Sequence, residues 1–80
     1  MGPTGRPRTP DRFVGALAAG SERSARRALE AGRADEARRH LVAAGRALST
    51  LLDGAPDGSR QREDLLCRIG RARIALGDVA

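Results

Sequence analysis

Residues 25–52, ARRALEAGRADEARRHLVAAGRALSTLL, decide the fold because they contain the end of one amphipathic helix, a glycine corner and a second complete helix. The second helix, expected over residues 34–52, carries one apolar stripe at alternating steps of four and three residues, namely Ala37, Leu41, Ala44, Leu48 and Leu51. Gly32 lies between the helices, where a left-handed residue ends a helix and only glycine avoids a Cβ penalty. The sequence therefore predicts a helical hairpin that turns at Gly32.

The composition favours helices along the whole chain. Of its 80 residues, 40% are hydrophobic and only 1% aromatic, and helix formers such as alanine, leucine and arginine dominate. A chain of this length supports at most one domain with a small core, so contact with a partner or self-association would add stability. The expected fold class is all-α, a small antiparallel helical bundle of three long helices.

The N-terminal residues divide into an arm and the start of the first helix. Residues 1–8, MGPTGRPR, are expected to form a disordered basic arm, which leaves residues 9–80 as a single helical-bundle domain. The Thr-Pro-Asp sequence at 9–11 predicts a helix start, because threonine caps free amides, proline suits the first position and aspartate complements the helix dipole. This helix should end near Ala31.

The interior of the first helix combines apolar residues with two glycines. Phe13 falls at a position expected to be core. Gly15 and Gly20 each cost about 1 kcal/mol relative to alanine, so they predict a bend or the close approach of another backbone.

A third helix is expected after the loop at residues 53–59, DGAPDGS. Asp57 or Ser59 can cap it. Gly77 is expected to end this helix and to leave residues 78–80 as a stub. Its apolar stripe is Leu65, Ile69, Ala72 and Leu76.

Charge and cysteine usage narrow the class of protein. The net charge is +5, yet all 15 basic residues are arginine and they alternate with acidic residues, as on solvated helix faces, so nucleic acid is not the expected partner. The single Cys67 cannot form an internal disulfide, which fits a cytoplasmic protein, and it lies at the edge of the third helix's stripe. No segment approaches the roughly 20 apolar residues of a membrane-spanning helix, so no membrane partner is expected.

No constellation of catalytic residues is apparent. His40, the only histidine, lies one helical turn after Glu36, which predicts an exposed contact rather than a general base. Metal-binding motifs, paired cysteines and phosphate-binding glycine loops are absent from the sequence. We therefore expect no enzyme activity, no small-molecule substrate, no cofactor and no bound metal.

The segments TPDRFVGALAAG and ARRALEAGRADEARRHLVAAGRALSTLLDG resemble the flagellar secretion chaperone family FliS. The shared features are the opening at residues 9–11, a Leu-x-x-Gly step from Leu17 to Gly20, the corner at Gly32 and the Leu-Asp close at 52–53. The family's tyrosine between that leucine and glycine is replaced by alanine here. The resemblance implies an antiparallel bundle that binds the disordered C-terminal segment of flagellin in the cytoplasm.

Two alternatives remain open. GRADEARRHLVAAGRAL resembles the turn and second helix of a tetratricopeptide repeat, which implies a protein-interaction scaffold. A less favoured alternative is an arginine-rich nucleic-acid-binding protein.

The favoured function is a protein- or peptide-binding module with an apolar helical groove. The residues expected to line that groove, each also a candidate for the core, are Val14, Leu17, Leu41, Leu48, Leu65 and Ile69.

Overall fold

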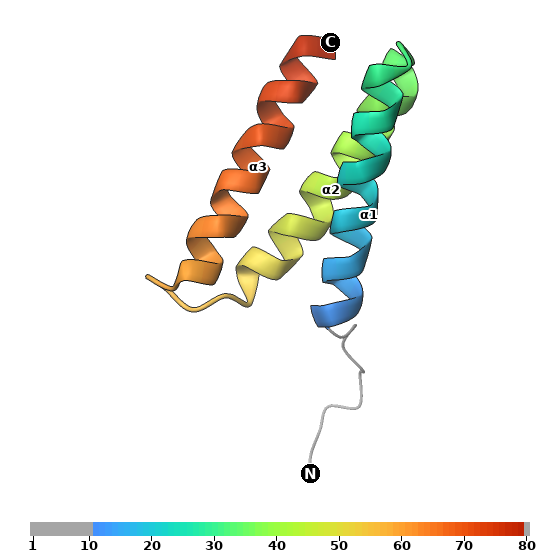
Figure 1. The fold of residues 1–80 in the computed structure, drawn as a ribbon. Helices are drawn as coiled ribbons and strands as arrows, with labels where there is room; N and C mark the ends of the chain where they lie inside the picture. The colour runs from blue at the N-terminus through green and yellow to red at the C-terminus, as the bar shows by residue number, and fades with distance from the viewer. Residues whose placement is uncertain (1–10, 80) are drawn as a thin grey trace.

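The computed structural model describes residues 11–79 and consists of three helices in antiparallel succession (Figure 1). They are α1 (Asp11–Glu30), α2 (Ala34–Asp53) and α3 (Arg60–Val79). No strand occurs within this range, so the expected all-α fold with three long helices is confirmed. The predicted N-terminal arm and the Thr-Pro helix start lie outside the described residues.

The turn between α1 and α2 forms at the predicted glycine. Gly32 has a φ of 75°, in the left-handed region. The N–H of Gly32 donates to the carbonyl of Leu29 at 3.1 Å, and the N–H of Arg33 donates to the carbonyl of Ala28 at 2.8 Å. These two bonds form a Schellman motif, which satisfies the last carbonyls of α1 and reverses the chain.

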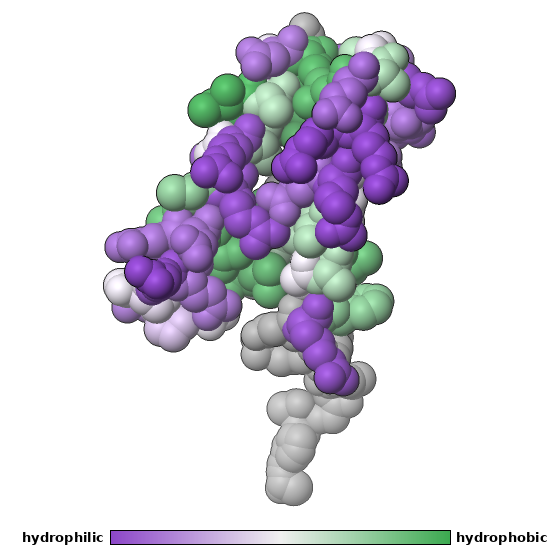
Figure 2. Space-filling model, in the orientation of Figure 1, coloured by the Kyte–Doolittle hydropathy of each residue, from purple (hydrophilic) through white to green (hydrophobic). Residues whose placement is uncertain are grey.

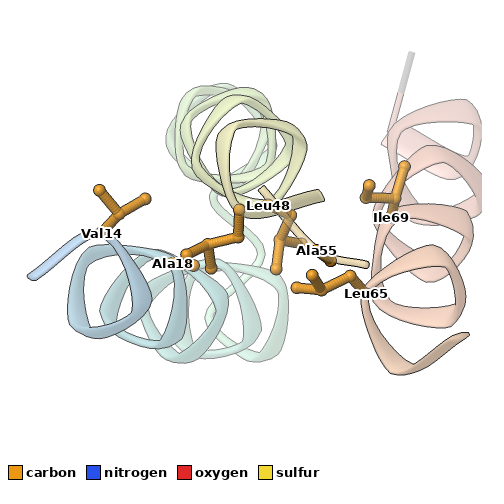
Figure 3. Close-up of a cluster of buried hydrophobic side chains, with 7 residues drawn as sticks. Val14, Ala18, Leu48, Ala55, Leu65 and Ile69 are labelled. Carbon is orange, nitrogen blue, oxygen red and sulfur yellow. The ribbon is translucent and has the colours of Figure 1, made fainter. Parts of the chain in front are cut away.

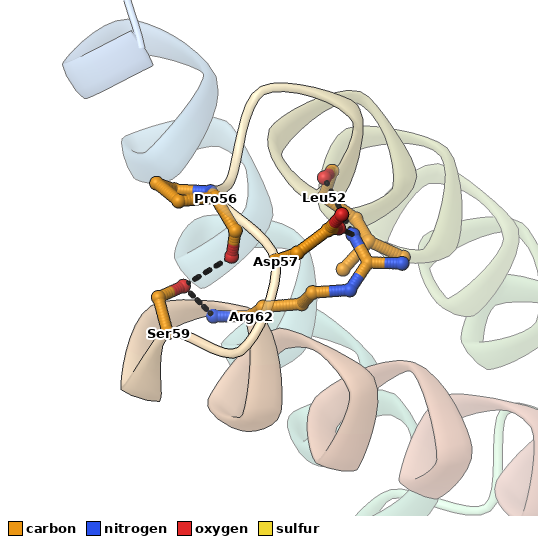
Figure 4. A network of polar contacts seen from close by, with 5 residues as sticks. All are labelled: Leu52, Pro56, Asp57, Ser59 and Arg62. Carbon is orange, nitrogen blue, oxygen red and sulfur yellow. Dashed lines mark hydrogen bonds and ion pairs between the residues drawn. The ribbon is translucent and has the colours of Figure 1, made fainter.

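Ser59, one of the two predicted caps, caps the N-terminus of α3 (Figure 4). Its Oγ accepts a hydrogen bond from the backbone N–H of Arg62 at 3.1 Å and donates one to the carbonyl of Pro56 at 2.7 Å. The loop also places Ala55 in the core, with 7% of its surface exposed. The loop is therefore held in place by the hydrogen bonds of Ser59 and by the burial of Ala55.

The α2 helix is the centre of the bundle because it packs against both of its neighbours. All five residues of its predicted stripe are buried, and Leu48 is the largest side chain that is completely buried. The larger core cluster, drawn in Figure 3, joins all three helices through Val14, Ala18, Leu48, Leu51, Ala55, Leu65 and Ile69. A smaller cluster further along the bundle consists of Ala25, Leu41 and Ala72.

Phe13 and Leu17 do not belong to the buried face of α1. Phe13 is 57% exposed and Leu17 is 52% exposed, so the prediction that Phe13 is core was wrong. The buried residues of α1 are Val14, Ala18, Ala25 and Ala28. These small side chains let α1 and α2 approach each other closely. The larger apolar side chains, Phe13 and Leu17, lie on the exposed flank of α1.

Gly77 behaves differently from the expectation. Gly77 does not end α3, which continues to Val79, because Gly77 lacks the left-handed conformation that terminates a helix. In α1, a Cβ added at Gly15 would meet nothing within 4 Å, and one at Gly20 would meet only the guanidinium of Arg23 at 4.0 Å. No backbone of another element approaches either residue, so one of the two expected roles, a close approach, is not found there.

Backbone contact between the first and third helices is absent in the described part of the chain. No Cα atom of α1 lies within 8 Å of a Cα atom of α3. The ribbon shows a gap between the backbones of α1 and α3 (Figure 1). Contact between these two helices is therefore made by side chains, in the larger core cluster and between Glu22 and Arg68.

Candidate functional site

The first candidate site is a groove between α2 and α3 to which α1 contributes no lining residue. We call it the α2–α3 groove; it has a volume of about 460 Å³. From α2 it is lined by Leu41, Val42, Gly45, Arg46, Ser49 and Thr50. From α3 it is lined by Ile69, Ala72, Arg73 and Leu76.

The α2–α3 groove exists because small residues stand where its wall would otherwise be filled. Gly45 has no side chain, and a Cβ added there would meet nothing within 4 Å. The floor is apolar, since Leu41, Ile69 and Ala72 are buried. Val42 borders it as a partly exposed apolar side chain, with 38% of its surface accessible. Apolar surface of this kind is available to a partner without any rearrangement of the core.

Two arginines give the rim of this groove a positive charge. Arg46 lies on α2 and Arg73 on α3, and both are exposed. Neither forms an ion pair with another residue of the described chain, and no acidic side chain from that part of the chain lines the groove. Both walls of the groove therefore carry a positively charged side chain, and no carboxylate that lines the groove balances them.

An arginine of each helix in the α2–α3 pair donates a hydrogen bond to a carbonyl near the C-terminus of the other helix. Arg38 Nη2 donates to the carbonyl oxygen of Val79, the last residue of α3, at 3.0 Å. Arg62 Nη1 makes a longer bond of 3.5 Å to the carbonyl of Leu52 near the end of α2 (Figure 4). Neither helix has a basic residue in its own last turn, so each is complemented by a cation from the other. These bonds favour a fixed groove width.

The second candidate is a cleft between α1 and α3, with a volume of about 250 Å³. We call it the α1–α3 cleft. It is lined by Glu22, Ala25, Arg26, Leu29, Leu41, Arg68, Arg71, Ala72 and Ala75.

An ion pair lies at the boundary of the α1–α3 cleft. Arg68 Nε donates to Glu22 Oε2 at 3.1 Å, and Arg68 Nη2 donates to Glu22 Oε1 at 2.5 Å. The hydrogen bond to Glu22 raises the pKa of Arg68, and the negative charges of Glu22 and Asp64 add to this against the opposing effect of burial. A further cavity, lined in part by Gly15, Leu65 and Arg68, lies beyond the pair.

Hydrophilic side chains accordingly span the space between α1 and α3 midway along the molecule (Figure 2). A helix could not lie along this cleft unless the ion pair opened. The α2–α3 groove has no such obstruction and is the better candidate for binding an extended partner.

The six residues predicted for the groove occupy different places. Leu41 and Ile69 lie together on the floor of the α2–α3 groove. Leu65 borders the cavity beyond the ion pair, while Val14 and Leu48 are buried in the larger core cluster. Leu17 is exposed on α1 and lines none of these cavities.

Six residues that line the α2–α3 groove were not predicted from the sequence, namely Val42, Gly45, Arg46, Ser49, Thr50 and Arg73. They flank the apolar stripes rather than belonging to them. Gly45 follows Ala44 and therefore lies about 100° around the helix from the centre of the α2 stripe. A glycine beside a buried stripe was the available indication of a depression in the surface.

The described residues were also considered for a metal site and for a membrane-spanning helix. No group of three or more His, Cys, Asp or Glu side chains comes together there. Cys67 is exposed, as expected for a residue at the edge of its stripe. None of the helices α1 to α3 combines the length and the apolar character needed to cross a membrane.

Comparison of the chain with protein-family models, curated proteins and solved structures gives no match. The groove and the chemistry of its residues therefore provide the basis for assigning a function.

Proposed function

We propose that the chain is a non-catalytic protein-binding module that accepts the apolar face of a helix in its α2–α3 groove. The observation that supports this most directly is the depression at Gly45 beside the buried floor residues Leu41 and Ile69. An amphipathic helix inserts side chains at intervals of three and four residues into such a groove.

The geometry of the neighbouring helices favours a helical ligand. Helices α2 and α3 are antiparallel, and each is 20 residues long. A helix laid between them would complete another layer of the bundle, with side chains interdigitating as they do between bundle helices. The ligand would cover Val42 and the accessible edges of the floor, and burial of apolar area would be the main favourable term.

A substitution that fills the groove tests the proposal without touching the core. Gly45→Leu places a side chain into open space and replaces glycine by a better helix former, so the fold should be retained. Gly15→Leu is the matched control, because Gly15 is also helical, also has open space at its Cβ position and lies outside the α2–α3 groove.

Binders for this test can be selected from a library of amphipathic helical peptides. We expect Gly45→Leu to lose peptide binding and Gly15→Leu to keep it, with both variants retaining a helical circular-dichroism spectrum. Peptides that bind both variants as tightly as the unmodified chain would contradict the assignment of the groove.

Among natural ligands, we propose the C-terminal segment of flagellin as the first to measure, because of the FliS resemblance in the sequence. Calorimetric titration with that peptide should give specific binding with a negative heat-capacity change, the mark of apolar burial. A scrambled peptide and a DNA oligomer are the controls. If the folded chain binds other helices in the groove but not this peptide, the chaperone assignment fails and the binding module remains.

A further inference from the structure

We infer that the partner of the α2–α3 groove is an acidic amphipathic helix, whose apolar stripe is flanked on both sides by carboxylates. The inference rests on the proposed function, since it names the chemistry of the helix that the groove accepts. Its basis is the placement of Arg46 and Arg73 on the two helices that form the walls of the groove.

These two arginines are available to a ligand. Three other arginines of α2 and α3 form ion pairs within the chain: Arg38 with Asp35, Arg62 with Asp57 and Arg68 with Glu22. The remaining arginines of these helices, Arg39, Arg60 and Arg71, do not line the α2–α3 groove. Arg46 and Arg73 have no such partner among the described residues, and the groove contributes no carboxylate of its own. A guanidinium group presents a planar fork that matches a carboxylate with two parallel hydrogen bonds.

The arginines lie on opposite walls of the groove, and their positions determine where charged residues are expected on the ligand helix. A helix whose apolar stripe rests on Leu41, Ile69 and Ala72 would direct its flanking residues toward the two rims. Carboxylates on both flanks would meet Arg46 on one side and Arg73 on the other. Lysines there would add like charges to an uncompensated positive rim.

The same charges argue against a second copy of this chain as the occupant. In a two-fold symmetric contact the same patch meets itself. Such a contact through this groove would bring the arginine rims of two molecules together, and each chain carries a net charge of +5. Charge complementarity therefore favours an acidic partner.

The test compares two synthetic helical peptides with the same leucine stripe, one with glutamates on both flanks and one with lysines. Fluorescence anisotropy at low ionic strength measures their binding to the full chain. We expect the glutamate peptide to bind about tenfold more tightly, as two partly exposed ion pairs allow, and added salt should reduce the difference.

Charge reversal localises the effect. The double variant Arg46→Glu, Arg73→Glu should reverse the preference, so that the lysine peptide binds more tightly. Arg26→Glu, Arg71→Glu is the matched control, because both arginines lie in the α1–α3 cleft and neither forms an ion pair within the described chain. It should keep the preference for glutamate. Circular dichroism confirms that each variant remains helical.

The outcomes separate this inference from the proposed function. Equal binding of both peptides, abolished by Gly45→Leu, would overturn the acidic partner and leave the groove as a binding site. Failure of the folded chain to bind either peptide would contradict both. Sedimentation showing a dimer that Gly45→Leu converts to a monomer would identify a second copy as the occupant and overturn the inference.

Discussion

Glu22 and Arg68 lie 46 residues apart in the sequence and form a two-pronged ion pair that joins α1 to α3. Because no Cα atoms of these helices come within 8 Å of each other, the pair spans helices that lack backbone packing. The side chains are 28% and 33% exposed, so water screens the pair only in part. The ion pair therefore does two things: it links the outer helices and it obstructs the α1–α3 cleft.

Removal of this ion pair should destabilise the bundle modestly. In a double-mutant cycle with Glu22→Gln and Arg68→Gln, we expect a coupling free energy of about 1 kcal/mol, the upper end for pairs that are not fully buried. Urea denaturation followed by circular dichroism measures it. The exposed pair Arg33 and Glu36 is the control and should couple by less than about 0.5 kcal/mol. Equal coupling in both pairs would refute a special role for Glu22 and Arg68.

The contribution of the arginine should persist at alkaline pH. A pKa that is higher in the folded than in the unfolded chain stabilises the fold fully below the unfolded value, and this stability is lost only as the pH rises through the folded value. Because Glu22 raises the pKa of Arg68 above its already high ordinary value, the coupling should be the same near pH 7 and near pH 10. A coupling that vanished by about pH 10 would contradict this account.

The core should depend on Leu48 far more than on Phe13. Leu48→Ala leaves a cavity at the only large, completely buried side chain of the described chain and should cost about 3 kcal/mol of unfolding free energy. Phe13→Ala removes a larger side chain that is mostly exposed, and should cost less than about 1 kcal/mol. Equilibrium denaturation of the two variants gives the comparison. A larger loss for Phe13→Ala would place Phe13 in the core after all.

Alanine substitutions at Gly32 and Gly77 should change the stability of the fold in opposite directions. Gly32→Ala puts a Cβ at a φ of 75° and should destabilise the fold by about 1 kcal/mol. Gly77→Ala lies inside α3 with open space around the new Cβ, and should stabilise by up to about 1 kcal/mol. Thermal denaturation distinguishes them. Destabilisation by Gly77→Ala would indicate that α3 ends before that residue.

Features with a local cause could be predicted from the sequence. The stripe from Ala37 to Leu51 follows from helical periodicity, and the turn at Gly32 follows from the unique conformational freedom of glycine. In α1, apolar residues occupy positions 13, 14, 17 and 18, and only the packing against α2 decides that Ala18 is buried and Phe13 is not. The local sequence pattern therefore predicts where a helix forms more reliably than it predicts which face of the helix is buried.

The candidate site depends on relationships that no local pattern contains. Gly45 forms a depression because α3 lies beside that flank of α2, and Arg73 reaches the same groove from another helix. The obstruction of the α1–α3 cleft depends on a contact between Glu22 and Arg68, which sequence spacing cannot reveal. Leu41 and Ile69 were predicted because the groove floor and the core share the same stripes.

The most direct test of the α2–α3 groove is an NMR titration of the isotope-labelled full chain with the glutamate-flanked helical peptide. If the groove is the binding site, the amide shifts concentrate at Gly45, Ser49 and Arg73 in the groove, while Glu22 and Leu29 in the α1–α3 cleft change little. Shifts centred on Glu22 and Leu29, with the groove residues unaffected, would contradict the account.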